Sequence, residues 1–404
     1  MKLFADDTSI FSVINDSNIS AATLNDDLEK INQWAFQWKM EFNPQISKRA
    51  QEVIFSRKNK KIIHPDLKFN NPKVEKTNTQ KHLGLLLDEK STFKTHIDLI
   101  INKASKGINV LRKLRYFLPR PSLLIIYKSF IRPHLDYVDV IYDQPNNTSV
   151  VKKLESVQYN AAIAITGAIR GTSTEKIYNE LGLESLQHRR WFRRLCLFFK
   201  ILKNKSPSYL YDLIPNQRHT INIRNPPKIS QIFCRTDTFS NSFFPDVIRE
   251  WNKLDNKISS SKSLTLFRSS LLKIIRKPVN SVFGILNPVG IQYLTRLRLD
   301  FSHLKEHKYH HNFADTLNPL CLCSLEAESV SHFFMRCNLF HNERLILMNN
   351  LLNIDPDIHL LDEIAISNLL LYGDDKYNLH KNSKILTVSI DYILSTKRFD
   401  GPLL

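Results

Sequence analysis

Residues 3–11 read LFADDTSIF, and this stretch decides how the beginning of the chain folds. Apolar residues flank the adjacent carboxylates Asp6 and Asp7, which predicts two short strands joined by a tight turn. Neighbouring side chains of a strand point to opposite faces. At the tip of a hairpin, however, both carboxylates can approach one cleft and hold divalent cations through oxygen ligands. The alternative is that the pair is an ordinary solvated turn.

The residues that follow predict a small α+β part and then a mostly helical protein. Leu24, Leu28 and Ile31 begin an apolar stripe within a helix expected from about residue 20 to 42, which Asn43-Pro44 would end. Residues 51–56 and 82–88 are strand-like. Further on, amphipathic periodicity predicts helices at 97–111, 123–131, 152–166, 175–181, 186–202, 244–254 and 264–274.

The low glycine content favours a mostly helical protein, and the net charge indicates a polyanionic partner. Only 9 of the 404 residues are glycine, and 57 Lys and Arg against 39 Asp and Glu give a net charge of +18. Such a charge favours nucleic acid or an anionic membrane surface. No apolar run approaches the roughly 18 to 20 residues of a membrane span. Because Asp6 and Asp7 interrupt the beginning, we expect no export signal. Five cysteines in a chain of this length do not form a disulfide framework, so we expect a reducing compartment and an intracellular protein, in the nucleus or the cytoplasm.

Three of the five cysteines cluster with a histidine near the carboxyl end. Cys321, Cys323, His332 and Cys337 have the spacing C-x-C-x8-H-x4-C. Three thiolates and an imidazole complete a tetrahedral Zn²⁺ shell without an open position, which predicts a structural zinc knuckle. The alternative is three buried free cysteines. His341 is a spare ligand if His332 faces away.

The predicted helix 186–202 is the most basic one. Arg189, Arg190, Arg193 and Arg194 are candidates for contacts with nucleic-acid phosphates, and basic residues of the helix near 97–111 could extend that face. The interleaved aromatic residues are interpreted as core, with stacking on bases as the alternative. A run of histidines from His303 to His311 is interpreted as a solvated helix face, although it could lie on the nucleic-acid side.

Several segments together resemble the reverse transcriptases of non-LTR retrotransposons of the jockey-like group. LFADDTSIF resembles their catalytic hairpin, and FNPQISKRAQEVIFS at 42–56 resembles the segment after it. HLGLLLD at 82–88 is similar to their primer-grip hairpin. Further similar segments are FIRPHLDYVDVIYD at 130–143, SFFPDVIREWNKLD at 242–255 and LTRLRLDFSHLKEHKYHHNF at 294–313.

The resemblance implies an RNA-directed DNA polymerase, with an RNA template and a DNA primer or an RNA–DNA hybrid as partners. Asp6 and Asp7 would be ligands of Mg²⁺, Lys48 would protonate the leaving pyrophosphate, and Gly84 would lie in the primer-grip turn. For Lys48, a solvated basic stretch is the alternative. The resemblance also supports zinc at the cysteine cluster. It implies a partial palm at 1–90, a helical thumb at 91–215, a connection at 216–290 and a helical region with the knuckle at 291–404.

One departure from the family bears on activity. The family's palm carries a third carboxylate on a strand well before the Asp-Asp hairpin, and Met1 precedes the hairpin directly. We therefore expect a carboxyl-terminal fragment that does not catalyse alone. The alternative is a non-catalytic module that binds RNA or an RNA–DNA hybrid. The sequence does not indicate an oligomeric state.

Overall fold

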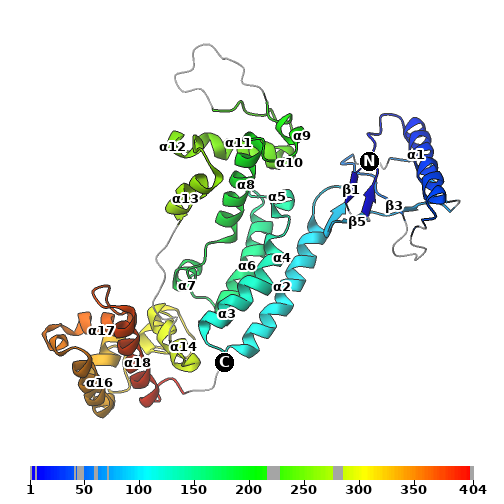
Figure 1. The fold of residues 1–404 in the computed structure, drawn as a ribbon. Coiled ribbons are helices and arrows are strands. Elements are labelled where there is room, and N and C mark those ends of the chain that lie inside the picture. The colour runs from blue at the N-terminus through cyan, green and yellow to red at the C-terminus, as the bar shows by residue number, and fades with distance from the viewer. Residues whose placement is uncertain are drawn as a thin grey trace. The chain divides into compact units, whose positions relative to one another are not determined.

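The computed structural model describes residues 2–4, 7–40, 42, 50–58, 62–70, 72–215, 228–275 and 285–400. It divides into two compact units, Met1–Ile100 and Ile101–Leu404. Figure 1 labels most of the helices and strands of the two units.

The first unit is a small α+β assembly. Its described elements are β1 (Lys2–Phe4), β2 (Asp7–Ser9), α1 (Ser17–Gln37), β3 (Gln51–Glu52), β4 (Glu75–Lys76), β5 (Thr79–His82), β6 (Leu85–Asp88) and the first residues of α2 (Lys94–Leu114). β1 and β2 form an antiparallel hairpin, as do β5 and β6, whereas β3 and β4 pair in parallel. Both predicted hairpins are thus present.

Helix α1 begins and ends at residues that explain its length. The Asp16 carboxylate caps it by accepting hydrogen bonds from the backbone N–H groups of Asn18 and Ile19. The helix ends at Gln37, before the predicted stop at Asn43-Pro44. Lys39 adopts a left-handed φ of 54°, and the N–H of Met40 returns to the carbonyl of Ala35, which closes the last turn.

The predicted strand at 51–56 is shorter in the structure. Only Gln51 and Glu52 pair, with Glu75 and Lys76 as their partners. The segment then leaves the ladder, and the N–H of Ser56 donates instead to the carbonyl of Glu89. Among the described residues, the apolar side chains at 53–55 therefore have no neighbouring strand that would extend the ladder.

In the described part of the second unit, which begins within α2, the regular elements are helices, apart from one isolated β-bridge. Its first elements are α3 (Arg120–Ile126), the π-helix η2 (Tyr127–Ile131), α4 (Arg132–Asp136), α5 (Asp139–Tyr142), α6 (Thr148–Thr166), α7 (Thr174–Leu181), α8 (Leu186–Leu202), α9 (Ser208–Tyr211), α10 (Asp237–Ser240), α11 (Phe243–Lys253), α12 (Asn256–Ser259) and α13 (Leu264–Ile275). The remainder are α14 (Pro288–Arg298), α15 (Lys305–His310), η4 (His332–Arg336), η5 (Asn338–Phe340), α16 (His341–Ile354), η6 (Pro356–Leu360), α17 (Glu363–Tyr372) and α18 (Leu379–Ser395).

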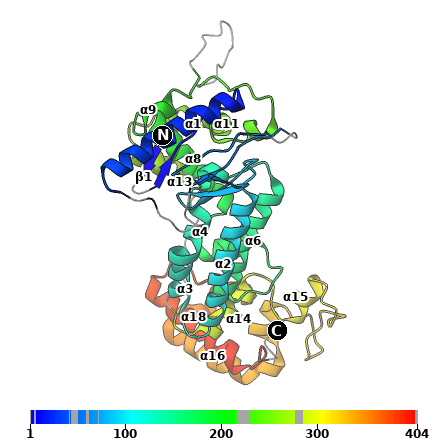
Figure 2. The same cartoon turned by 90° about the vertical axis from the view of Figure 1, so that its right-hand side faces the viewer.

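Two buried apolar clusters hold these helices together. In the first, α8 packs against α11 and α13, and the ring of Phe199 stacks on that of Phe267 with centroids 4.6 Å apart. Phe198 and Phe199 are buried, so their interpretation as core residues is confirmed. In the second cluster, α18 packs against α14, α16 and α17. Figure 2 shows α18 beside α14 and α16. Burial of this apolar surface is what stabilises helices with otherwise basic surfaces.

The mostly helical fold with a small α+β amino-terminal part is confirmed. Within the described ranges, no helix combines the length and the hydropathy that a membrane span requires. The finer boundaries at 90, 215 and 290 stay predictions.

Candidate metal centre and nucleic-acid interface

The cysteine cluster converges in space. Cys321, Cys323, His332 and Cys337 each offer one donor atom, and the four atoms lie within 4.8 Å of one another. Cys321, His332 and Cys337 are buried, while Cys323 is half-buried. His341, the spare ligand of the sequence, is exposed at the first turn of α16 and is not part of the cluster.

Two local structures bring these four residues together. Cys321 and Cys323 lie in a tight turn, because the N–H of Cys321 donates to the carbonyl of Glu326 at 2.9 Å. His332 and Cys337 are joined by a π-helical turn, in which the N–H of Cys337 donates to the carbonyl of His332 at 2.8 Å. A π-helical turn places a different set of side chains on one face than an α-helix does. Such turns occur frequently at functional sites.

The distances fit one tetrahedral metal ion. The Sγ atoms of Cys321 and Cys337 are 3.6 Å apart, and Cys323 Sγ lies 3.3 Å from His332 Nε2. Ligands at normal zinc distances are separated by about 3.8 Å for two sulfurs and about 3.5 Å for sulfur and nitrogen. Burial raises the pKa of the Cys321 thiol to about 12. A bound cation would offset this cost by stabilising the thiolate. The cluster could therefore hold zinc.

Glu326 orients the histidine of the cluster, and the sequence analysis did not identify it. Its Oε1 lies 2.8 Å from His332 Nδ1, which leaves Nε2 directed at the sulfurs. Arg336 donates to both carboxylate oxygens of Glu326 and also to Glu363 on α17. These contacts with Arg336 and His332 lower the pKa of Glu326 to about 2. An acidic residue between the second cysteine and the histidine is the signal that could have found it.

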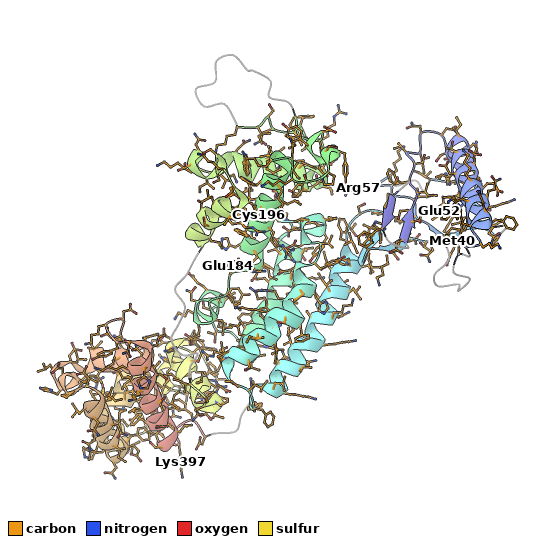
Figure 3. All side chains as sticks on the ribbon, viewed as in Figure 1. Met40, Glu52, Arg57, Glu184, Cys196 and Lys397 are labelled. Atoms are coloured by element: carbon orange, nitrogen blue, oxygen red, sulfur yellow. The ribbon has the colours of Figure 1, made fainter. Side chains whose placement is uncertain are left out.

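The remaining cysteines do not belong to this cluster. Cys196, labelled in Figure 3, is buried on α8 among the apolar residues of the first core. Cys234 is half-buried, and its thiol donates to the carbonyl of Ile232. Both provide internal controls for measurements on the cluster.

The predicted catalytic residues are described only in part. Asp7 is exposed at the start of β2, where it pairs in register with Phe4 across the hairpin. Asp6 and Lys48 lie outside the described residues. The structure therefore places one carboxylate at the turn end of the hairpin, and the predicted roles of all three residues stay predictions.

Gly84 occupies the two-residue turn between β5 and β6. Leu83 and Gly84 both have left-handed backbones, with φ of 46° and 87°, and His82 pairs with Leu85. Positive φ at both central residues is the type I′ turn of tight hairpins, which glycine adopts without steric cost. The hairpin expected at 82–88 is thus built around this glycine.

The arginines of α8 lie differently from the prediction. Arg190 and Arg194 are buried, so they do not belong to a surface that phosphates could reach. Arg194 Nη1 lies 3.0 Å from both Asp143 and Asp246, and Arg190 Nη1 lies 3.2 Å from Asp143. Arg189 and Arg193, which are partly exposed, pair with Asp136, and Arg193 also pairs with Asp139. The physical reason is that a buried guanidinium requires a carboxylate partner.

Helix α2 offers the better basic surface in the second unit. Lys103, Lys106 and Lys113 are exposed, and their spacing places them within about 80° of one helical face. Ala104, Ile108 and Leu111 are buried on the opposite face. No ion pair is found for the three lysines among the described residues. Their charges are therefore available to an external anion.

Comparisons with known proteins find two curated relatives of this chain. No family model matches it, and no solved structure gives a significant match. Over 190 residues it is 28% identical to the RNA-directed DNA polymerase from mobile element jockey of Drosophila melanogaster, which covers 45% of this chain and 20% of that protein. Over 179 residues it is 26% identical to the probable RNA-directed DNA polymerase from transposon X-element of the same organism, covering 43% of this chain and 19% of that protein.

The chain spans about a fifth of the length of these two relatives. It is similar, over somewhat less than half of its own length, to RNA-directed DNA polymerases of jockey-like mobile elements, and the resemblance to this group of reverse transcriptases is thereby confirmed.

Proposed function

We propose that this chain is part of an RNA-directed DNA polymerase of a non-LTR retrotransposon, and that it holds the nucleic acid on which the enzyme acts. The observation that carries the proposal is the similarity to the jockey and X-element polymerases. In this proposal the first unit supplies a partial palm and the helices that follow supply a thumb. The exposed lysines of α2 would contact backbone phosphates without reading sequence. The nucleus as the site of action stays a prediction.

Asp6 and Asp7 are the residues that would hold magnesium. The Asp7 side chain is exposed at the turn end of the hairpin. Oxygen donors are the ligands that Mg²⁺ prefers. When bound, paired Mg²⁺ ions activate the primer hydroxyl and neutralise the leaving pyrophosphate. A two-metal site needs carboxylates from more than one strand, so we propose that these 404 residues alone bind a primer–template without extending it.

A primer-extension assay with the purified chain tests this proposal. We expect no template-dependent incorporation of nucleotides in the presence of Mg²⁺, together with binding of the labelled primer–template. Incorporation that Asp6→Asn abolishes would show that the chain carries a complete active site. Absence of any binding would contradict the nucleic-acid function itself.

We also propose that Cys321, Cys323, His332 and Cys337 hold one structural Zn²⁺. The convergence of the four donor atoms within 4.8 Å supports this. The metal would join the turn at Cys321 to the π-helical turn at His332 and so order residues that have little regular structure. Three thiolates and one imidazole leave no position for substrate, so the role is structural.

Elemental analysis of the dialysed full chain tests the zinc proposal. We expect one zinc per chain in the wild type and in Cys196→Ser, because Cys196 lies in the apolar core of α8. We expect Cys323→Ser to lose the metal. Equal zinc contents in Cys323→Ser and Cys196→Ser would reject the site.

A further inference from the structure

A small polar cavity lies in the second unit, where the residues after α2 meet the end of α6 and the first turn of α14. Its lining includes Arg115, Arg120, Thr166, Gly167 and Gln292. The free volume is about 10 Å³, which is room for roughly one water-sized particle. Arg115 is half-buried and is the most exposed of these five lining residues.

Three residues that line the cavity carry buried N–H groups for which the described part of the chain provides no hydrogen-bond partner. They are Nε of Arg115, Nε of Arg120 and the side-chain amide nitrogen of Gln292. Arg120 is 3% exposed and Gln292 is 6% exposed. A guanidinium donates hydrogen bonds and cannot accept them. The cavity therefore presents donors that require an acceptor, because buried polar groups are nearly always hydrogen-bonded.

The charged residues near the cavity also favour the binding of an anion. Arg120 Nη1 and Arg298 Nη1 contact the same oxygen of Glu180, at 2.8 and 3.0 Å. Among the described residues, Glu180 is the only carboxylate that forms an ion pair with Arg120. Arg296 Nε donates to the carbonyl of Gly167 at 2.9 Å and brings a further positive charge. An anion would compensate this excess, and buried charges are normally compensated.

The local backbone fixes the geometry of the cavity. Gly167 ends α6 with a left-handed φ of 68°, and a Cβ atom there would lie 2.4 Å from Cγ of Gln292. Glycine is thus required both by the backbone and by the close approach of Gln292. Gln292 lies in the second turn of α14, whose amino-terminal end is the positive end of the helix dipole.

We propose that this cavity receives one oxygen of an oxyanion of the phosphate class, bound by Arg115, Arg120 and Gln292. The remaining oxygens lie at the mouth, beside Arg115. A free phosphate and a phosphate of a nucleic-acid backbone have the same chemistry here. Binding of a nucleic-acid phosphate rests on the function proposed above, whereas binding of a free phosphate does not.

Thermal unfolding of the full chain in phosphate, against chloride at equal pH and ionic strength, tests the site. The wild type should gain about 3 °C in a saturable manner. Gln292→Glu is nearly isosteric and supplies its own anion, so it should be more stable without phosphate and gain nothing from it. Exclusion of phosphate from the protein surface acts on every variant alike. Equal phosphate effects on the wild type and Gln292→Glu, or no effect on either, would overturn the proposal.

Arg115→Gln provides a second variant if Gln292→Glu fails to fold, and Arg112→Gln is its matched control. Arg112 is exposed three residues earlier, on the last turn of α2, and does not line the cavity. Arg115→Gln should reduce the phosphate effect on the unfolding temperature, whereas Arg112→Gln should leave it unchanged. An equal phosphate effect in both variants would count against the site.

Binding of an RNA–DNA duplex separates the two sources. If the site takes a backbone phosphate, Arg115→Gln should weaken duplex binding more than Arg112→Gln and lower the salt slope by about one. Equal duplex binding, together with a phosphate effect confined to the wild type and Arg112→Gln, assigns the site to a free oxyanion. Failure of the wild type to bind the duplex would contradict the proposed function and leave the phosphate result standing.

Discussion

At the scale of single residues, Glu326 is the carboxylate that orients the histidine of the cysteine cluster. Its contact with His332 Nδ1 fixes which ring nitrogen faces the sulfurs. Carboxylate partners of this kind typically contribute a factor of about 10 to 100 in metal affinity. We therefore expect Glu326→Gln to weaken zinc binding by about that factor, as measured by competition with a chelating dye.

Glu363→Gln is the matched control for this measurement. Glu363 also contacts Arg336 but has no contact with His332. Its substitution should leave the zinc affinity nearly unchanged. If both substitutions weaken zinc binding equally, the ion-pair network and not the histidine contact is responsible.

His307 differs from the solvated histidine face that the sequence suggested, because its side chain is buried. Its Nδ1 lies 2.9 Å from the hydroxyl of Ser302, and burial lowers its pKa to about 4. Asp300, His310, His311 and Lys176 are the other charged or titratable groups that affect it. The unfolded chain therefore binds a proton between pH 6.5 and pH 4 that the folded chain does not, so acid destabilises the fold.

This difference gives a prediction for pH dependence. Between pH 7.5 and pH 5, His307 should account for about 2 kcal/mol of lost unfolding free energy. His307→Gln should remove that part of the pH dependence, whereas His310→Gln should not, because His310 is exposed. Denaturant unfolding at the two pH values measures both. An unchanged pH dependence in His307→Gln would contradict the buried neutral state.

At the scale of the elements, α8 shows a basic helix whose charges are partly structural. Removing one partner of a buried ion pair typically costs about 3 to 5 kcal/mol. Arg194 pairs with Asp143 and Asp246, so we expect Arg194→Gln to lower the unfolding free energy by an amount of that order. Lys106→Gln, on the exposed face of α2, should change it by less than about 0.5 kcal/mol. Equal stability of the two variants by denaturant unfolding would contradict the buried network.

The same helix shows which structural features can be predicted from the sequence and which cannot. Its bounds, 186 to 202, follow from the apolar stripe, and the structure has a helix at these residues. The burial of Arg190 and Arg194 does not follow, because their partners lie about 50 or more residues away in the chain. A signal was nevertheless present, since the acidic residues at 136, 139 and 143 match the helical spacing of the arginines.

The convergence of the cysteine cluster was easier to predict from the sequence than the cavity. Its ligands come from one stretch of 17 residues, so their spacing alone suggested convergence. The cavity needs Arg115, Gly167 and Gln292 from segments far apart in sequence, and only the packing of α14 against α6 brings them together. Local spacing carries no information about such contacts.

At the scale of the whole molecule, the chain combines a small α+β unit with a larger basic helical one. The net charge is +18, and not all of the basic residues are used in internal ion pairs, since the lysines of α2 are exposed. A protein that holds a nucleic-acid backbone releases counterions on binding, so its affinity falls steeply as salt is added. The account therefore predicts sequence-independent, salt-dependent binding by the 404-residue chain.

The salt dependence of binding to a fluorescent RNA–DNA duplex tests this claim most directly. The logarithm of the affinity should fall linearly with the logarithm of salt concentration, alike for unrelated sequences. Replacing Lys103, Lys106 and Lys113 by Gln should reduce the slope by up to about three. The same change at the exposed Lys253, Lys257 and Lys262 should leave it nearly unchanged. Binding that ignores salt, or equal slopes for both triple variants, would contradict the account.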